Sequence, residues 1–204
     1  MRLHIANKER SSWSLRPWLM LKMAGIEFEE ELHLFLDDLA QQRQQWSSFS
    51  PNSKVPVLVD GDVTVWDSLA ICLYLGERYP NIWPEDKAAR IWAYSAAAEM
   101  HSGFPELRTQ CDFRITPVEV PLVPDANLAA EVRRINELWQ QGLTRFGGDF
   151  LAGNRFSAAD AFYAPVALRL LNYGLLDYLS SDVAAYVKRI AALDAVQEWC
   201  REAR

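Results

Sequence analysis

Apolar and polar positions divide the chain into two halves of different character. Over about the first 80 residues, strand and helix signals alternate. A short strand is predicted over 3–6 and a second strand over 28–34, with an amphipathic helix between them. Leu15, Trp18 and Leu19 fall on one face of that helix, and Gly25 ends it. A strand, a helix and a strand in this order predict a βαβ unit with parallel strands.

A hairpin and another helix complete the first half. Asp60-Gly61 lies between two β-branched runs, which is a hairpin signature. A helix is predicted over 68–78, whereas 37–50 is polar with weak helical character. Pro80 and Pro84 then break the helical pattern, so the linker is placed at 81–86 after a first domain over 1–80.

The second half, over 87–204, is predicted to be all-helical. Helices are expected over 88–113, 128–146 and 158–173, with two more within 182–200. A proline-rich loop is expected over 116–124. The predicted fold is therefore a small α/β domain followed by an all-α helical domain.

Composition and charge exclude several classes of protein. The net charge is -6 and no Lys/Arg run is present, which argues against general nucleic-acid binding. No apolar stretch approaches the ~18 residues of a membrane span, and a signal-peptide core is missing at the start. Cysteines and histidines number three each and lie far apart in sequence. We therefore expect a reduced, cytoplasmic protein that holds no metal.

The first candidate site is the segment 10–16 between the first strand and the first helix. Ligands bind at the carboxyl ends of strands in such units, where helix N–H groups favour an anion. The alternative is that Ser12 or Ser14 only caps the helix. With Ser14 as the cap, Pro17 falls in the first turn, where its missing N–H removes no hydrogen bond within the helix. This alternative does not explain why Ser11 and Ser12 are present.

Two further candidates lie on the hairpin and the helix after it. Pro56 at a strand start indicates an edge, a bulge or a cis peptide, and a cis bond would expose the Val55 main chain to an extended peptide. The alternative is an ordinary strand-entry proline. Asp67 and Ser68 precede a helix; they either cap it or receive the two charged groups of a peptide's amino-acid end.

The second half offers one structural motif and one candidate pocket. Ser157 and Asp160 form the S-x-x-D version of a capping box, which we interpret as structural. His101, Phe104 and Arg108 have the spacing of one helical face, with Gly103 inside it. They either line a pocket or surround a satisfied interior histidine.

Together these motifs resemble the cytosolic glutathione S-transferase family over the whole chain. The segment R-S-S-W-S-L-R at 10–16 is similar to the S-S-C-S-x-R signature of the zeta class. Lys54-Val55-Pro56 matches the cis-proline element, and D-S-L-A-I at 67–71 matches the E/Q-S-x-A-I segment. The S-x-x-D box matches as well. The resemblance implies a thioredoxin-like first domain, glutathione as co-substrate, and a homodimer acting on a small electrophile.

The resemblance also implies a role for particular residues. Ser11 aligns with the catalytic serine, which would stabilise the glutathione thiolate as a hydrogen-bond donor. The glutathione-binding residues would be Ser12, Lys54, Val55, Asp67 and Ser68. The electrophile would lie among Trp13, His101, Phe104 and Arg108.

Two departures from the family pattern leave other functions open. Trp13 replaces the zeta cysteine, and Asp67 is shorter than the usual Glu or Gln. The alternatives are a binding protein on the same fold with a vestigial site, and a glutathione-dependent isomerase. A thiol–disulfide reductase would need a cysteine at the first helix, and 11–14 contain none.

Overall fold

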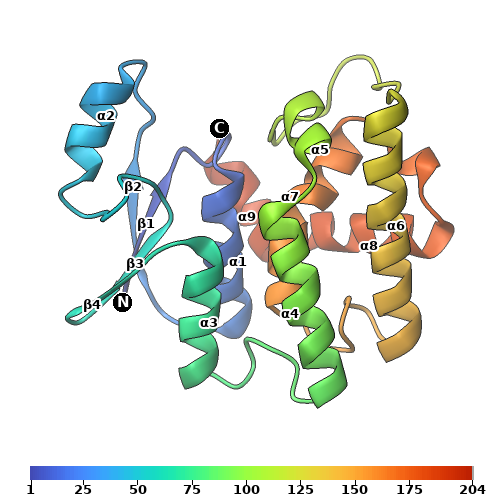
Figure 1. The fold of residues 1–204 in the computed structure, drawn as a ribbon, viewed down its shortest axis with the longest axis horizontal. Coiled ribbons are helices and arrows are strands. Elements are labelled where there is room, and N and C mark those ends of the chain that lie inside the picture. The colour runs from blue at the N-terminus through green and yellow to red at the C-terminus, as the bar shows by residue number, and fades with distance from the viewer. Residues whose placement is uncertain (204) are drawn as a thin grey trace.

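The structure is a computed structural model that describes residues 1–203. Its first half is a four-stranded sheet with helices on both sides (Figure 1). The elements run in the order β1 (Arg2–Ala6), α1 (Ser12–Ala24), β2 (Glu29–His33), α2 (Leu39–Trp46), β3 (Val57–Asp60), β4 (Val63–Val65) and α3 (Ser68–Arg78).

The sheet has the strand order β2-β1-β3-β4. β1 pairs in parallel with β2 and antiparallel with β3, and β3 and β4 form a hairpin. The predicted βαβ unit and hairpin are therefore confirmed. α1 and α3 cover the face of the sheet that looks toward the second half, and α2 lies beyond the opposite face (Figure 1).

The second half is helical, as predicted. It contains α4 (Lys87–Ser102), α5 (Pro105–Gln110), α6 (Ala126–Phe146), α7 (Ala158–Asn172), α8 (Ser181–Ala192) and α9 (Asp194–Glu202). A short 3-10 turn over Leu176–Tyr178 was not predicted. Among residues 1–203, no helix is both long and apolar enough to cross a membrane.

The apolar helix α7 lies at the centre of the molecule and is buried along almost its whole length. It packs against α1, α4 and α8 (Figure 1). The predicted capping box at its start is present: Asp160 accepts hydrogen bonds from the main-chain N–H and the hydroxyl of Ser157 at 2.9 and 3.0 Å. The box is buried, as its structural interpretation requires.

The single helix expected over 88–113 is wrong. α4 ends at Ser102 and α5 begins at Pro105, and Phe104 between them has a left-handed φ of 61°. Proline is tolerated in the first turn of a helix but breaks a helix interior, and it disfavours helical geometry in the residue before it. Pro105 therefore divides the predicted helix in two.

Residues 79–86 connect the two halves without forming a helix or strand. The indole of Trp83 is buried and donates a hydrogen bond from Nε1 to the main-chain oxygen of Cys72 at 3.0 Å. The oxygen of Ile82 accepts from the main-chain N–H of Ala158 at 2.8 Å. These bonds attach the connection to α3 on one side and to α7 on the other.

Candidate functional site

The first helix begins with Ser11 as its cap. The Ser11 hydroxyl oxygen accepts from the main-chain N–H of Ser14 at 3.4 Å, and the two hydroxyls lie 2.7 Å apart. The alternative interpretation, in which Ser12 or Ser14 caps the helix, is therefore wrong. The Ser14 side chain instead contacts the end of β1, where its oxygen accepts from the main-chain N–H of Ala6 at 3.2 Å. Pro17 consequently lies inside the helix rather than in its first turn.

A cavity of about 450 Å³ lies in front of this helix start. Ser11 lines the cavity although only 4% of its surface is exposed. The walls come from the start of α1, from α2, from the loop before β3 and from the start of α3. The lining residues are Arg10, Ser11, Trp13, Phe35, Gln42, Trp46, Asn52, Ser53, Lys54, Val55, Pro56 and Asp67. Five predicted site residues are among them.

The loop before β3 forms one wall of the cavity. The Val55–Pro56 peptide bond is cis, as the resemblance implied, so Pro56 is not an ordinary strand-entry proline. Ser50 fixes the loop: its hydroxyl donates to the main-chain oxygen of Lys54 at 2.6 Å and accepts from the Lys54 N–H at 3.0 Å. Val55 lines the cavity just before the strand β3, which begins at Val57.

Asp67 caps α3 and also meets a side chain from the second half. Its Oδ1 accepts from the main-chain N–H groups of Leu69 and Ala70 at 3.0 and 3.3 Å. Its Oδ2 lies 3.0 Å from Nε2 of His101. The carboxylate is still partly open, with 42% of the side chain exposed, and it lines the cavity.

His101 connects this carboxylate to the aromatic wall. Its ring packs edge-on against Trp13, with 5.2 Å between centroids, and its Nδ1 is buried without a hydrogen-bond partner. Burial lowers the pKa of His101, against the opposing effect of Asp67. The imidazole is therefore neutral at neutral pH, with Nε2–H donating to Asp67.

Ser12 and Ser68 lie behind the cavity rather than on its wall. Both are buried, and neither lines the cavity. Ser12 Oγ lies 3.5 Å from Nη2 of Arg169, and Ser68 Oγ accepts from Nη1 of Arg16 at 3.3 Å. Their hydroxyls therefore face arginines.

Arg16 and Arg169 belong to a group of buried arginines that sequence reasoning missed. The Arg16 guanidinium lies 4.1 Å from the ring of Trp13 and 4.8 Å from that of Phe162. Burial lowers its pKa to about 9, and the charges of Arg108 and Arg169 act in the same direction. The sequence did offer one indication, because Arg169 is a lone charge within the apolar helix α7. A charged side chain is buried in such a helix only where hydrogen-bond or charge partners surround it.

Phe104 and Arg108 do not line the cavity and do not share a helical face with His101. Phe104 is buried in the core at the junction of α4 and α5. The Arg108 guanidinium donates to the main-chain oxygens of Met100 and Gly103, so it caps the end of α4. The Arg108 guanidinium lies 5.1 Å from the ring of Trp13, which lines the cavity.

The two buried cysteines are poorly suited to thiol chemistry. Burial raises the pKa of Cys72 to about 12 and that of Cys111 to about 11. Since the thiolate is the reactive form, neither residue is a nucleophile at neutral pH.

This fold and cavity define a class of protein in which a small sheet domain carries a ligand cleft beside an all-helical domain. A family model described as glutathione S-transferase, N-terminal domain, matches residues 10–78, and one described as glutathione S-transferase, C-terminal domain, matches residues 93–202. The chain therefore belongs to the glutathione S-transferase family, whose enzymes use glutathione as co-substrate.

Individual relatives agree with this assignment. The chain is 29% identical over 171 residues to glutathione S-transferase 1 of Dianthus caryophyllus, covering 81% of this chain and 75% of that protein. It is 29% identical over 162 residues to a zeta class glutathione S-transferase of Euphorbia esula, covering 76% of this chain and 70% of that protein. A sphingomonad glutathione S-transferase, solved in complex with glutathione, superposes with a TM-score of 0.66 at 25% identity, covering 100% of this chain and 98% of the other.

Proposed function

We propose that this chain binds glutathione in the cavity beside Ser11 and activates its sulfur as a thiolate for attack on a small electrophile. The observation that carries the proposal is the position of Ser11, which lines the cavity and caps the start of α1. The first N–H groups of a helix lack partners within the helix, and the helix dipole favours an anion there. A free thiol has a pKa of ~8.5, so a donor at this point increases the reactive fraction at neutral pH.

The contact between Ser11 and Ser14 supports such a donor. A hydroxyl oxygen can accept hydrogen bonds while its proton rotates to a new acceptor. In the structure the Ser11 hydroxyl donates to the Ser14 oxygen at 2.7 Å, and Ser14 also accepts from the Ala6 N–H at 3.2 Å. When a sulfur occupies the cavity, this bond can reverse, with the Ser14 hydroxyl donating to Ser11. The Ser11 proton then turns to the sulfur in the cavity. Ser11 acts as a donor to the thiolate and forms no covalent bond.

The rest of glutathione is placed by the remaining walls. The Val55 main chain pairs with the cysteinyl part as an added strand would, next to Lys54. The γ-glutamyl end lies at the start of α3, where its amine meets the open side of the Asp67 carboxylate and its carboxylate meets helix N–H groups. We assign the side chains of Ser12 and Ser68 a supporting role, because their hydroxyls face Arg169 and Arg16.

The electrophile is placed on the open side of the sulfur, against Trp13. The sulfur forms the new bond and the electrophile loses a leaving group or gains a proton at the adjacent atom. His101, Phe104 and Arg108 then shape this wall through their contacts with and around Trp13 rather than by touching the electrophile. A homodimer in the cytoplasm is the expected form of such an enzyme.

Replacing Ser11 by alanine tests the proposal. We expect kcat/KM toward an aryl halide electrophile to fall roughly 10²-fold, as for loss of one donor to a developing anion, with a much smaller change in glutathione affinity. Ser11→Thr keeps the hydroxyl and should retain most of the rate. Because Ser11 also caps α1, the free energy of unfolding is measured in parallel; loss of the cap costs about 1 kcal/mol.

The same experiment separates the alternatives. A binding protein without catalysis would take up glutathione, yet show no turnover in the wild-type chain. An isomerase would lose activity toward a cis–trans substrate in Ser11→Ala while transferring glutathione poorly in both forms. An unchanged rate in Ser11→Ala would contradict the assigned role of the serine.

A further inference from the structure

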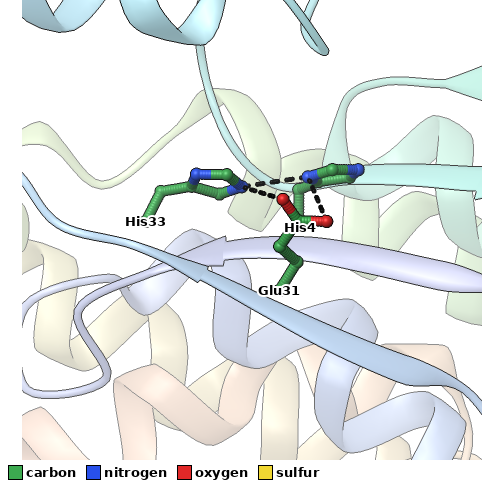
Figure 2. A group of neighbouring side chains, drawn as sticks. All are labelled: His4, Glu31 and His33. Atoms are coloured by element: carbon green, nitrogen blue, oxygen red, sulfur yellow. Dashed lines mark hydrogen bonds and ion pairs between the residues drawn. The ribbon is translucent and has the colours of Figure 1, made fainter.

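Two of the three histidines, although far apart in sequence, meet on the outer face of the sheet. The parallel register of β1 and β2 pairs His4 with Glu31 and Ala6 with His33. Nδ1 of His4 lies 2.9 Å from Nε2 of His33. Figure 2 shows the carboxylate of Glu31 between the two imidazoles, and each nitrogen lies 3.8 Å from one of its oxygens.

These three side chains are held in place by their surroundings. Both imidazoles stack on the ring of Phe49, with centroid distances of 4.5 Å for His4 and 4.1 Å for His33. Phe49 covers the ring faces and leaves the ring edges, where the nitrogen lone pairs lie, directed at one another and at Glu31. Side-chain exposure is 6% for His4, 18% for His33 and 44% for Glu31, so solvent reaches the group from the carboxylate side.

The distances between the donor atoms are close to those between ligand atoms that bind one metal ion. Bonds of 2.0–2.1 Å in a tetrahedron place ligand atoms roughly 3.3 Å apart. The observed separations of 2.9, 3.8 and 3.8 Å bracket that value. Shifts of about half an ångström would therefore bring the three donor atoms to the spacing of metal ligands. The half-exposed carboxylate of Glu31 is free to make most of that movement.

The protonation required for metal binding is also available. Both imidazoles must offer a lone pair, which a neutral pair does once the shared proton shifts to an outer ring nitrogen. Burial lowers the pKa of His4 and of His33, which favours the neutral rings.

The charges around the group are mixed. Arg2 lies 3.5 Å from the Glu31 carboxylate and 3.2 Å from that of Glu29, so it competes with a cation for Glu31. Glu29 offers Arg2 an alternative partner, which lets Glu31 turn to an ion without leaving the guanidinium unpaired. Among residues 1–203, no other charged side chain forms an ion pair with the group.

We propose that His4, Glu31 and His33 form a binding site for a divalent first-row transition ion. Two imidazoles and one carboxylate suit Zn²⁺, Ni²⁺ or Co²⁺, with water in the open position. The ion would hold the edge strand β2 to β1. It would also lie behind one wall of the cavity, because Trp46 lines the cavity and packs edge-on against His33 at 6.4 Å.

The test uses the full chain without a polyhistidine tag, freed of metal by a chelator. Titration with ZnCl₂ in a calorimeter should give one bound ion per chain, and Co²⁺ should give the visible absorption of a protein-bound ion. We expect Glu31→Gln and His33→Ala to weaken Zn²⁺ binding at least about tenfold. Loss of a group that only orients a metal ligand lowers metal affinity about 10- to 100-fold, and loss of the ligand itself should lower it at least as much. His101→Gln is the matched control, because it removes the one histidine outside the group and should bind Zn²⁺ as the wild type does.

Thermal unfolding provides a second measurement. An ion that binds only the folded chain raises Tm. Zn²⁺ should therefore raise Tm of the wild type and of His101→Gln but not of His33→Ala. Glu31→Gln preserves the shape of a half-exposed side chain, so it reports on binding even if a histidine variant folds poorly. Absence of one-to-one binding, or equal binding by Glu31→Gln and wild type, would overturn the proposal.

Discussion

At the start of α1, what each serine hydroxyl can do depends on what it already contacts. Ser11 has Ser14 behind it and the cavity in front, whereas Ser12 faces Arg169 of α7. Local sequence shows two adjacent serines and cannot distinguish them, because the distinguishing contact comes from a residue far along the chain. By contrast, Asp67 as a helix cap follows from its local motif, and the cis Val55–Pro56 bond follows from the family resemblance.

The histidines show the same limit of sequence reasoning. His4 and His33 are distant in sequence, and a protein without a metal was expected partly for that reason, but strand pairing brings the two residues together. A predicted parallel pair of strands was already available. Its register was not, because β2 is largely exposed and lacks a clear alternation of buried positions. The expectation of a chain without a metal site depended on that missing register.

His101 makes the stability of the protein depend on pH. It faces Asp67 of α3, Trp13 and Arg16 of α1, Arg108 of α5 and Phe162 of α7. Because its pKa is lowered from 6.5, the unfolded chain takes up the proton first as the pH falls. The free energy of unfolding should therefore decrease as the pH falls from 6.5 to the lowered pKa.

Urea unfolding of wild type and His101→Gln at pH 7.5 and pH 5.5 measures this contribution. We expect the loss of stability between the two pH values to be smaller in His101→Gln, since glutamine does not titrate. The comparison cancels the effects of His4, His33 and the carboxylates, which both proteins share. A larger loss in the variant would contradict the direction of the pKa shift.

Among the elements, α7 depends most on a single side chain. The buried carboxylate of Asp160 accepts from the N–H of Leu151, from both donors of Ser157 and from the hydroxyl of Tyr186. Asp160→Ala leaves all of these donors unpaired. We expect the free energy of unfolding to fall by at least about 3 kcal/mol in chemical denaturation.

The exposed cap of α4 is the matched control for that prediction. Asp86 is exposed and accepts from the N–H of Ala89 at 2.8 Å. Asp86→Ala should cost about 1 kcal/mol, the usual value for a lost helix cap. Equal effects of Asp86→Ala and Asp160→Ala would show that the buried network adds nothing beyond ordinary capping.

The elements also show where local pattern is sufficient. α3 has the predicted bounds, and α6 and α7 end next to glycines with a left-handed φ at Gly147 and Gly174. These boundaries depend on caps and turns within a few residues. The break after α4 was missed because the helical spacing of apolar residues continues across it. The helix nevertheless ends there, because Pro105 starts a new helix and Arg108 caps the end of α4.

For the molecule as a whole, the sheet domain and the helical domain share one core. A continuous cluster of buried apolar side chains extends from β1 and α1 into α7 and α9. The indole of Trp199 in α9 donates to the main-chain oxygen of Lys8 at 2.8 Å. Lys8 in turn lies within 5.3 Å of the Trp199 ring and pairs with Glu30 and Glu202.

Because this core crosses between the halves, we expect the chain to unfold as one cooperative unit. Scanning calorimetry should show a single transition, with the calorimetric enthalpy equal to the van't Hoff enthalpy. Glutathione should move that whole transition upward, since it binds only the folded chain. Two separable transitions, with only the earlier one sensitive to glutathione, would contradict a shared core.

The pKa of the glutathione thiol in the bound state tests the central claim most directly. It is measured from the ultraviolet absorbance of the thiolate as the pH is raised, in wild type and in Ser11→Ala. A charge-assisted hydrogen bond of roughly 1.5–3 kcal/mol corresponds to about one to two pKa units. We predict a bound thiol below its free value of ~8.5 in the wild type and a rise of that size in Ser11→Ala. The same thiol pKa in both proteins would contradict the account.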